Sequence, residues 1–116
     1  MIKDDMSSIK IIDFGFAAFT KTNQGVHQRL KLFCGTPSYM APELVKKAEY
    51  DGSKVDMWAL GVLLFCLLTG SFPFKGTSEA ELYSRIMRGW YKFPQGHRNL
   101  TKETRQIIQK CLTVDQ

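Results

Sequence analysis

The run from Met57 to Leu68 constrains the fold more than any other part of the sequence, because its twelve residues include no charged side chain. The pattern predicts a helix that begins at Ser53, runs to about Thr69 and stops at Gly70. The Ser53 hydroxyl would cap this helix, with Asp56 as the second half of a capping box. A helix that is apolar on every face must lie inside the protein, and a membrane span needs about 20 apolar residues. We therefore expect a central helix and no membrane partner.

Start and stop residues mark two further long helices. Ser78 and Glu81 form a capping box before a helix that ends at Gly89, and Thr101 opens another helix. Residues 41–45 suit a brief helix, because proline and an acidic residue are favourable in a first turn. Apolar side chains recur at helical spacing and are expected to face inward: Leu82, Ile86, Met87, Ile107, Ile108, Cys111 and Leu112.

Residues 8–12 alternate in polarity and are rich in isoleucine, so they predict a short strand. Residues 16–40 show no sustained period and predict a long loop. Loops of that length inside a compact domain are usually functional. The expected fold class is therefore mainly α with a short β element and three to four helices.

Composition excludes several classes of protein. The 116 residues are enough for one small domain, and 44% apolar with 23% charged side chains is globular usage. The net charge of +5 comes from basic residues scattered singly, which favours a solvated surface over a nucleic-acid site. Three widely spaced cysteines argue against a disulfide framework or a zinc site. The polar N-terminus is not a signal peptide, so a cytoplasmic location is expected.

Asp13 directly follows the expected strand and precedes Phe14 and Gly15. A carboxylate at a strand end beside a glycine suits a magnesium ion, although the same three residues also occur as a plain turn. Further motifs follow in order: Gly35-Thr36-Pro37 with Tyr39-Met40-Ala41-Pro42-Glu43, then Asp56-Met57-Trp58-Ala59-Leu60-Gly61, then Gly70-Ser71-Phe72-Pro73-Phe74. Together these residues resemble the C-terminal lobe of a eukaryotic serine/threonine protein kinase domain, from the DFG strand through the activation segment to the helices beyond. The resemblance covers residues 1–116 as one partial domain.

The resemblance implies roles for six residues. Asp13 would hold magnesium between the phosphates of ATP, with Phe14 and Gly15 completing the nucleotide-side motif. Thr36 would face the protein substrate, and Glu43 would pair with an arginine late in the domain. Asp56 would hydrogen-bond the backbone of the catalytic loop. Simpler interpretations remain open: Thr36 as a loop residue, Glu43 as a first-turn charge, Asp56 as a capping partner, and Phe14 and Trp58 as core.

Two departures from the family pattern concern regulation and specificity. Leu32 stands where many relatives carry a phosphorylatable threonine, which leaves Thr20 and Thr22 as acceptors. Cys66 stands where cyclic-nucleotide-dependent relatives carry a glutamate. Residues 86–94 are similar to the calcium/calmodulin-dependent and AMP-activated-related group.

The parts that such a kinase needs upstream of DFG are not found in this sequence. Residues 1–12 contain no histidine, arginine or asparagine, so the HRD…N catalytic loop and its base are absent. The glycine-rich loop and the nucleotide-binding lysine are absent too. Phosphoryl transfer depends on these parts acting together, so we expect residues 1–116 alone to transfer no phosphate. ATP and Mg²⁺ are implied for a full-length family member.

Three hypotheses follow. In the first, the chain is a C-terminal-lobe fragment of a serine/threonine kinase, and the longer parent protein phosphorylates protein substrates. In the second, the chain is a non-catalytic, pseudokinase-like module that docks a protein partner. The third is a decayed gene product without a function. Because the central helix would lack some neighbours, we also expect self-association through its uncovered surface.

Overall fold

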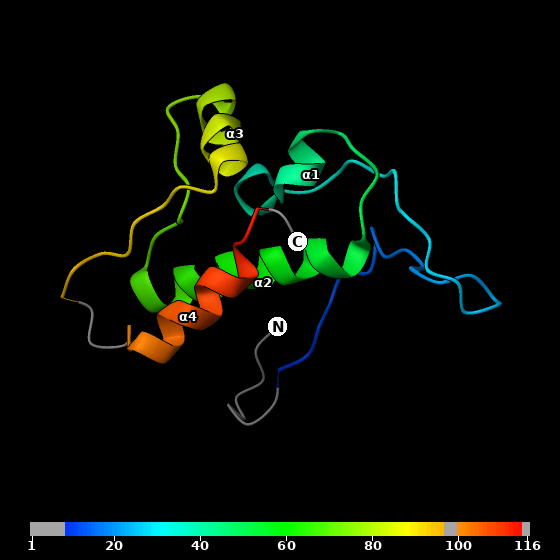
Figure 1. Cartoon of the computed structure of the whole chain (residues 1–116), viewed down its shortest axis with the longest axis horizontal. Helices are drawn as coiled ribbons and strands as arrows, with labels where there is room; N and C mark the ends of the chain where they lie inside the picture. Colours follow the sequence, from blue (N-terminus) through cyan, green and yellow to red (C-terminus); the bar gives the residue numbers. More distant parts are fainter. Residues whose placement is uncertain (1–8, 97–99, 115–116) are drawn as a thin grey trace.

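The computed structural model describes residues 9–96 and 100–114. In chain order its helices are the 3₁₀ helix η1 (Pro37–Tyr39) and the α-helices α1 (Pro42–Val45), α2 (Gly52–Thr69), α3 (Glu79–Arg88) and α4 (Lys102–Cys111). Helix α2 lies at the centre, with α4 along one side and η1, α1 and α3 on another (Figure 1). The prediction of a mainly α fold built around the helix of residues 53–69 is confirmed.

The core surrounds the middle of α2. Trp58 stacks on Phe74 with ring centroids 5.6 Å apart, and Phe65 packs edge-on against Tyr91. The fully or almost fully buried members of this core come from all parts of the helical body: Ala41, Trp58, Val62, Phe65, Phe74, Ile86, Leu100, Ile108 and Leu112. Three of these nine residues, Trp58, Phe65 and Phe74, are aromatic, and aromatic side chains bury the most apolar area each.

Helices α2 and α4 approach closely at Gly61. A Cβ atom at this position would lie 2.6 Å from the Cβ of Cys111 and 3.1 Å from Cδ2 of Leu112. The absence of a side chain at Gly61 therefore sets the distance between the two helices.

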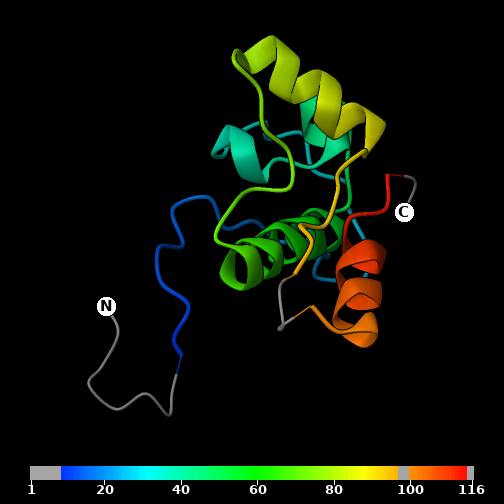
Figure 2. The same ribbon diagram turned by 90° about the vertical axis from the view of Figure 1, so that its left-hand side faces the viewer.

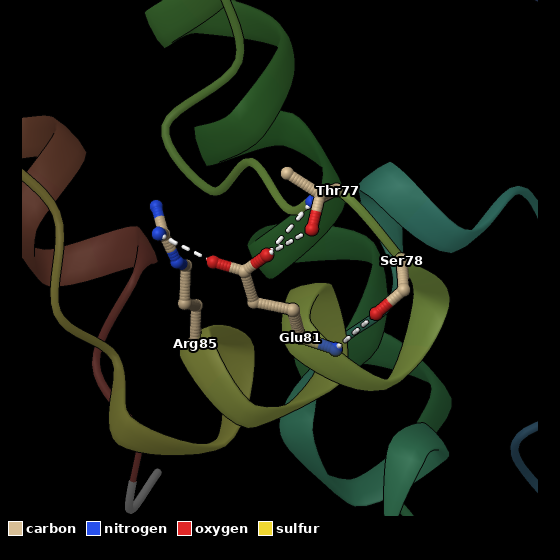
Figure 3. Close-up of polar contacts among 4 residues, drawn as sticks. All are labelled: Thr77, Ser78, Glu81 and Arg85. Carbon is tan, nitrogen blue, oxygen red and sulfur yellow. Dashed lines mark hydrogen bonds and ion pairs between the residues drawn. The ribbon is translucent and has the colours of Figure 1, made fainter.

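Helix termini follow the expected chemistry at most positions. Ser78 accepts a hydrogen bond from the Glu81 N–H, and the Glu81 carboxylate bonds Thr77 and Arg85 instead of returning to Ser78 (Figure 3). Thr101 caps α4 by accepting from the Thr104 N–H. Gly70 and Gly89 end α2 and α3 at φ angles of 70° and 61°, in the left-handed region that glycine adopts most easily.

The predicted cap of α2 is wrong. Asp51, and not Ser53, occupies the N-cap, and its Oδ1 accepts from the Ser53 N–H at 2.9 Å and from the Ser53 hydroxyl at 2.6 Å. The helix begins at Gly52 as a result, and Asp56 takes no part in the cap. Both residues can cap a helix, and the earlier one prevails because its carboxylate reaches the free N–H groups of the first turn.

The predicted strand is also wrong over the residues that the structure describes, 9–12, while Ser8 lies outside them. Ile9, Ile11 and Ile12 are 99%, 83% and 65% exposed and pair with no other segment of the described chain. A strand is stable only when a neighbour satisfies its backbone groups and covers its side chains. Figure 2 shows this segment running apart from the helical body.

Ile107 is 54% exposed although it was expected to face inward. Ile108, Cys111 and Leu112 are buried as expected, so α4 buries a narrower face than its apolar content suggests. Within α3, Ile86 is fully buried while Leu82 and Met87 are half-buried.

Helix α2 is, among the described residues, long and apolar enough to cross a membrane by length and composition alone, with a mean hydropathy of 1.4 over 18 residues. The central helix of a globular domain meets the same test. Here α2 packs against α4 and η1 and carries the core residues Trp58, Val62 and Phe65.

Candidate functional site

Asp13 lies in a turn that its own side chain helps to form. Its Oδ1 accepts a hydrogen bond from the Gly15 N–H at 3.2 Å, and the Ala17 N–H bonds the Phe14 carbonyl at 3.0 Å. The backbone at Asp13 has a φ of 64°, a left-handed conformation that aspartate tolerates better than most residues because its short polar side chain bonds locally. The carboxylate is exposed, and its Oδ2 remains open to a ligand.

Phe14 is 69% exposed, so the interpretation of Phe14 as a core residue is wrong in this structure, whereas Trp58 is core at 2% exposure. Among the described residues no group of three or more histidine, cysteine or acidic side chains could hold a metal. Asp13 therefore offers a single carboxylate. One carboxylate together with phosphate oxygens is a normal magnesium environment, so the residue fits the ion that the sequence predicted.

The loop predicted over residues 16–40 is irregular from 16 to 36, but its last part forms the 3₁₀ helix η1 (Pro37–Tyr39). A tight turn stabilises the first part of the segment. Thr22 accepts from the Val26 N–H through its hydroxyl, and its own N–H donates to the Val26 carbonyl at 2.8 Å. Gln28 closes the same turn through its N–H to Thr20 and its side-chain amide to Phe19. Thr20 and Thr22, the two candidate phosphate acceptors, thus lie at the base of this turn.

The second part of the segment is tied to the chain just before α2. Leu30 and Tyr50 exchange two backbone hydrogen bonds of 2.8 and 3.1 Å, and the Tyr50 hydroxyl donates to the Leu32 carbonyl at 2.6 Å. Lys31 forms an ion pair of 2.6 Å with Glu49. Burial raises the pKa of Tyr50, and the hydrogen bond between Lys31 and Glu49 raises the pKa of the lysine and lowers that of the glutamate.

Sequence reasoning missed these ties. Tyr50 and its partners are about 20 residues apart along the chain, and no local pattern connects them. The one sequence feature that could have indicated a contact is Tyr50 itself, a large side chain with a hydroxyl donor immediately before the helix-capping Asp51.

Thr36 is exposed and precedes η1. Its carbonyl accepts from the Tyr39 N–H at 3.0 Å, while its hydroxyl makes no capping hydrogen bond. The hydroxyl is therefore free to contact a bound molecule.

Glu43 lies half-buried in the first turn of α1 and lines a pocket of about 370 Å³. The same pocket is lined by Lys46, Lys54, Trp58 and Val114. The Trp58 Nε1 atom is buried and has no hydrogen-bond partner within the described part of the chain. Glu43 forms no ion pair with the described residues, so the pocket presents an open carboxylate, whereas the Trp58 Nε1 donor is buried beside it.

Asp56 is exposed on α2 and makes no hydrogen bond or ion pair to another described side chain. Among the described residues, Asp13, Glu43 and Asp56 do not gather into a group of three acidic side chains that could hold a metal. Thr36 precedes η1 and makes no side-chain capping hydrogen bond there.

Residues 1–116 match the family model described as the protein kinase domain, and the chain belongs to that family. It is 42% identical over 116 residues to a probable serine/threonine-protein kinase MARK-A of Dictyostelium discoideum, covering 99% of this chain and 10% of that protein. It is 40% identical over 112 residues to CBL-interacting protein kinase 5 of Oryza sativa subsp. japonica, covering 97% of this chain and 23% of the relative. CBL-interacting serine/threonine-protein kinase 5 of Arabidopsis thaliana is 38% identical over 117 residues, covering 99% of this chain and 25% of that protein.

These relatives confirm the resemblance to serine/threonine kinases of the calcium/calmodulin-dependent and AMP-activated-related group. The chain spans between a tenth and a quarter of the length of these three relatives. It therefore corresponds to part of a kinase domain.

Proposed function

We propose that the complete protein transfers the γ-phosphoryl group of ATP to serine and threonine hydroxyls of protein substrates. The observation that carries this proposal is the match of residues 1–116 to the protein kinase domain. The sequence Asp13-Phe14-Gly15, which resembles the metal-binding motif of that family, supports the role we assign to Asp13. The relatives named as serine/threonine kinases support the choice of acceptor.

In this proposal Asp13 holds Mg²⁺ through the oxygen that the Gly15 N–H leaves open. When bound, the ion neutralises charge on the ATP phosphates and orients them for in-line transfer. Phe14 and Gly15 set the position of the carboxylate, since the Phe14 carbonyl and the Gly15 N–H close the turn around it.

In the same proposal, Thr36 contacts the protein substrate, and Glu43 and Asp56 stabilise the structure around the site. The free Thr36 hydroxyl faces the protein substrate, and Glu43 receives a cationic side chain in its pocket. Asp56 accepts hydrogen bonds from the backbone of the catalytic loop. Residues 1–116 by themselves form a partial C-terminal lobe and transfer no phosphate, because the sequence supplies no catalytic base and no nucleotide-binding lysine. A cytoplasmic location is part of the same proposal.

A non-catalytic binding module is the second candidate function. The segment of residues 16–36, which is exposed at most positions although Tyr50 and Glu49 tie it to the chain before α2, favours this function. Two relatives carry the words CBL-interacting in their names, which supports a protein partner in general. In this case the protein would capture one partner without nucleotide.

Calorimetric titration of ATP into the complete polypeptide, with and without Mg²⁺, separates the two functions. We expect binding that Mg²⁺ strengthens in the wild type, and binding that Mg²⁺ no longer strengthens in Asp13→Asn. Asp51→Asn serves as a matched control, because it removes one carboxylate charge at an aspartate outside residues 13–15. Absence of Mg²⁺-dependent nucleotide binding, together with capture of a partner, would favour the module.

A further inference from the structure

A second pocket, of about 460 Å³, shares no lining residue with the Glu43 pocket and differs from it in its chemistry. We name it the aromatic groove. Its aromatic lining includes Phe72, Trp90 and Phe93, and its charged lining residues are Lys75, Arg85 and Lys92. No acidic side chain of the described residues lines it. The groove is therefore apolar in its walls and cationic in its charge.

Two of the three cations are available to a ligand. Arg85 is neutralised by Glu81, whose Oε1 lies 2.6 Å from the guanidinium Nη2 (Figure 3). Lys75 and Lys92 form no ion pair within the described residues, and the Lys92 Nζ lies 5.2 Å from the centre of the Trp90 ring. The two free ammonium groups give the groove a net positive charge.

The walls offer apolar contact and an additional donor. Trp90 is 71% exposed at the rim, which is unusual for the largest apolar side chain and typical of interface residues. Tyr91 packs against Phe65, Phe74 and Phe93, and its hydroxyl makes no hydrogen bond to the described residues. Burial raises the pKa of Tyr91 to about 12, so its hydroxyl stays protonated and able to donate.

We propose that the aromatic groove docks an acidic peptide segment of a partner protein, one that carries aspartate or glutamate next to an apolar side chain. The lysines would attract the carboxylates, and the apolar side chain would lie against Trp90 and Phe93. A compact pocket with two free cations fits a short peptide better than a nucleic acid, which requires a basic track along its backbone. The proposal does not rest on phosphoryl transfer.

The test is fluorescence anisotropy with a fluorescein-labelled peptide of alternating glutamate and leucine, titrated with the complete polypeptide. We expect binding to the wild type and a loss of roughly tenfold or more in affinity for the double variant Lys75→Glu/Lys92→Glu. The matched control is Lys10→Glu/Lys102→Glu, which changes the net charge equally at two exposed lysines that line neither pocket. The control is expected to bind as the wild type does. Trp90→Ala, which reverses no charge, should also weaken binding.

Three results would overturn the proposal: no binding of the acidic peptide, equal loss in the groove variant and the control, or tighter binding of an oligothymidine probe that the groove variant abolishes. Far-UV circular dichroism of each variant ensures that a loss of binding is not a loss of fold. The outcome is independent of kinase activity, which can be measured on the same variants.

Discussion

Asp51 determines where the central helix begins. Its carboxylate accepts two hydrogen bonds from Ser53, one from the backbone and one from the hydroxyl. These hydrogen bonds, the side-chain one first, lower the pKa of Asp51. The Asp51 carboxylate stabilises the fold in its charged form. Its contribution to the free energy of unfolding is therefore fully present above the pKa of an aspartate in the unfolded chain, and it is lost as the pH falls through the lower pKa of Asp51 in the folded protein.

We predict that Asp51→Ala lowers the Tm by a few degrees near neutral pH, and that the difference from the wild type shrinks as the solution is acidified. Ser53→Ala, at the residue that the sequence favoured as the cap, should lower the Tm less. Thermal unfolding followed by circular dichroism across the acidic range measures both. A larger effect of Ser53→Ala, or a difference that does not depend on pH, would show that Asp51 is not the cap.

At the same scale, Asp13 shows how much of a site a sequence can reveal. The DFG motif could be recognised because its three residues are consecutive, and the structure shows how the turn forms locally. The tie between Leu30 and Tyr50 and the pocket around Glu43 and Trp58 could not be predicted, because they join positions far apart in the chain.

At the scale of elements, the end of α3 depends on both backbone conformation and packing. Gly89 has a φ of 61°, and a Cβ atom there would lie within 2.5 Å of the Val114 side chain, much too close for two carbon atoms. Gly70 ends α2 at a φ of 70° with no atom within 4 Å of such a Cβ. The two glycines therefore differ in crowding and not in conformation.

We predict that Gly70→Ala lowers the free energy of unfolding by about 1 kcal/mol, the cost of a left-handed alanine. Gly89→Ala should cost about 1–3 kcal/mol more, because it also crowds Val114. Val114→Ala in the Gly89→Ala background should recover most of that additional loss. Urea unfolding of the wild type, Gly89→Ala, Val114→Ala and the double variant measures the coupling between the two positions, and Gly70→Ala is measured beside them. Additive effects of Gly89→Ala and Val114→Ala would contradict the contact.

Helix ends could be predicted from the sequence, whereas strand pairing and the burial of a helix face could not. The caps at Ser78 and Thr101 and the stops at Gly70 and Gly89 were predicted because they need only neighbouring residues. The strand at residues 8–12 was predicted wrongly because a strand needs a partner that local alternation cannot supply. Ile107 was placed wrongly because helical spacing indicates which side chains share a face, but not how much of that face a neighbour covers.

At the scale of the whole molecule, α2 carries an uncovered apolar surface. Met57, Leu60, Leu63 and Leu67 recur at helical spacing, so they share one face, and they are 46%, 51%, 42% and 74% exposed. Contiguous apolar surfaces of this kind drive association between molecules. The expectation of self-association therefore has a specific location.

We predict that residues 1–116 alone associate as their concentration rises, and that Leu60→Lys/Leu67→Lys shifts the population towards monomer. Sedimentation velocity over a concentration series measures this shift. The control, Ser84→Lys/Gln106→Lys, adds the same charge at exposed polar positions and should leave association unchanged. Equal dissociation in both variants would mean that net charge, and not the α2 surface, governs association.

The most direct test of the account is transfer of labelled phosphate from ATP to a serine-containing protein substrate by the complete polypeptide, compared with its Asp13→Asn variant. We predict transfer by the wild type that falls roughly a hundredfold or more in the variant, because the magnesium ligand is lost. Residues 1–116 alone should show no transfer. Undiminished transfer by Asp13→Asn, or transfer by residues 1–116 alone, would contradict the roles that we propose.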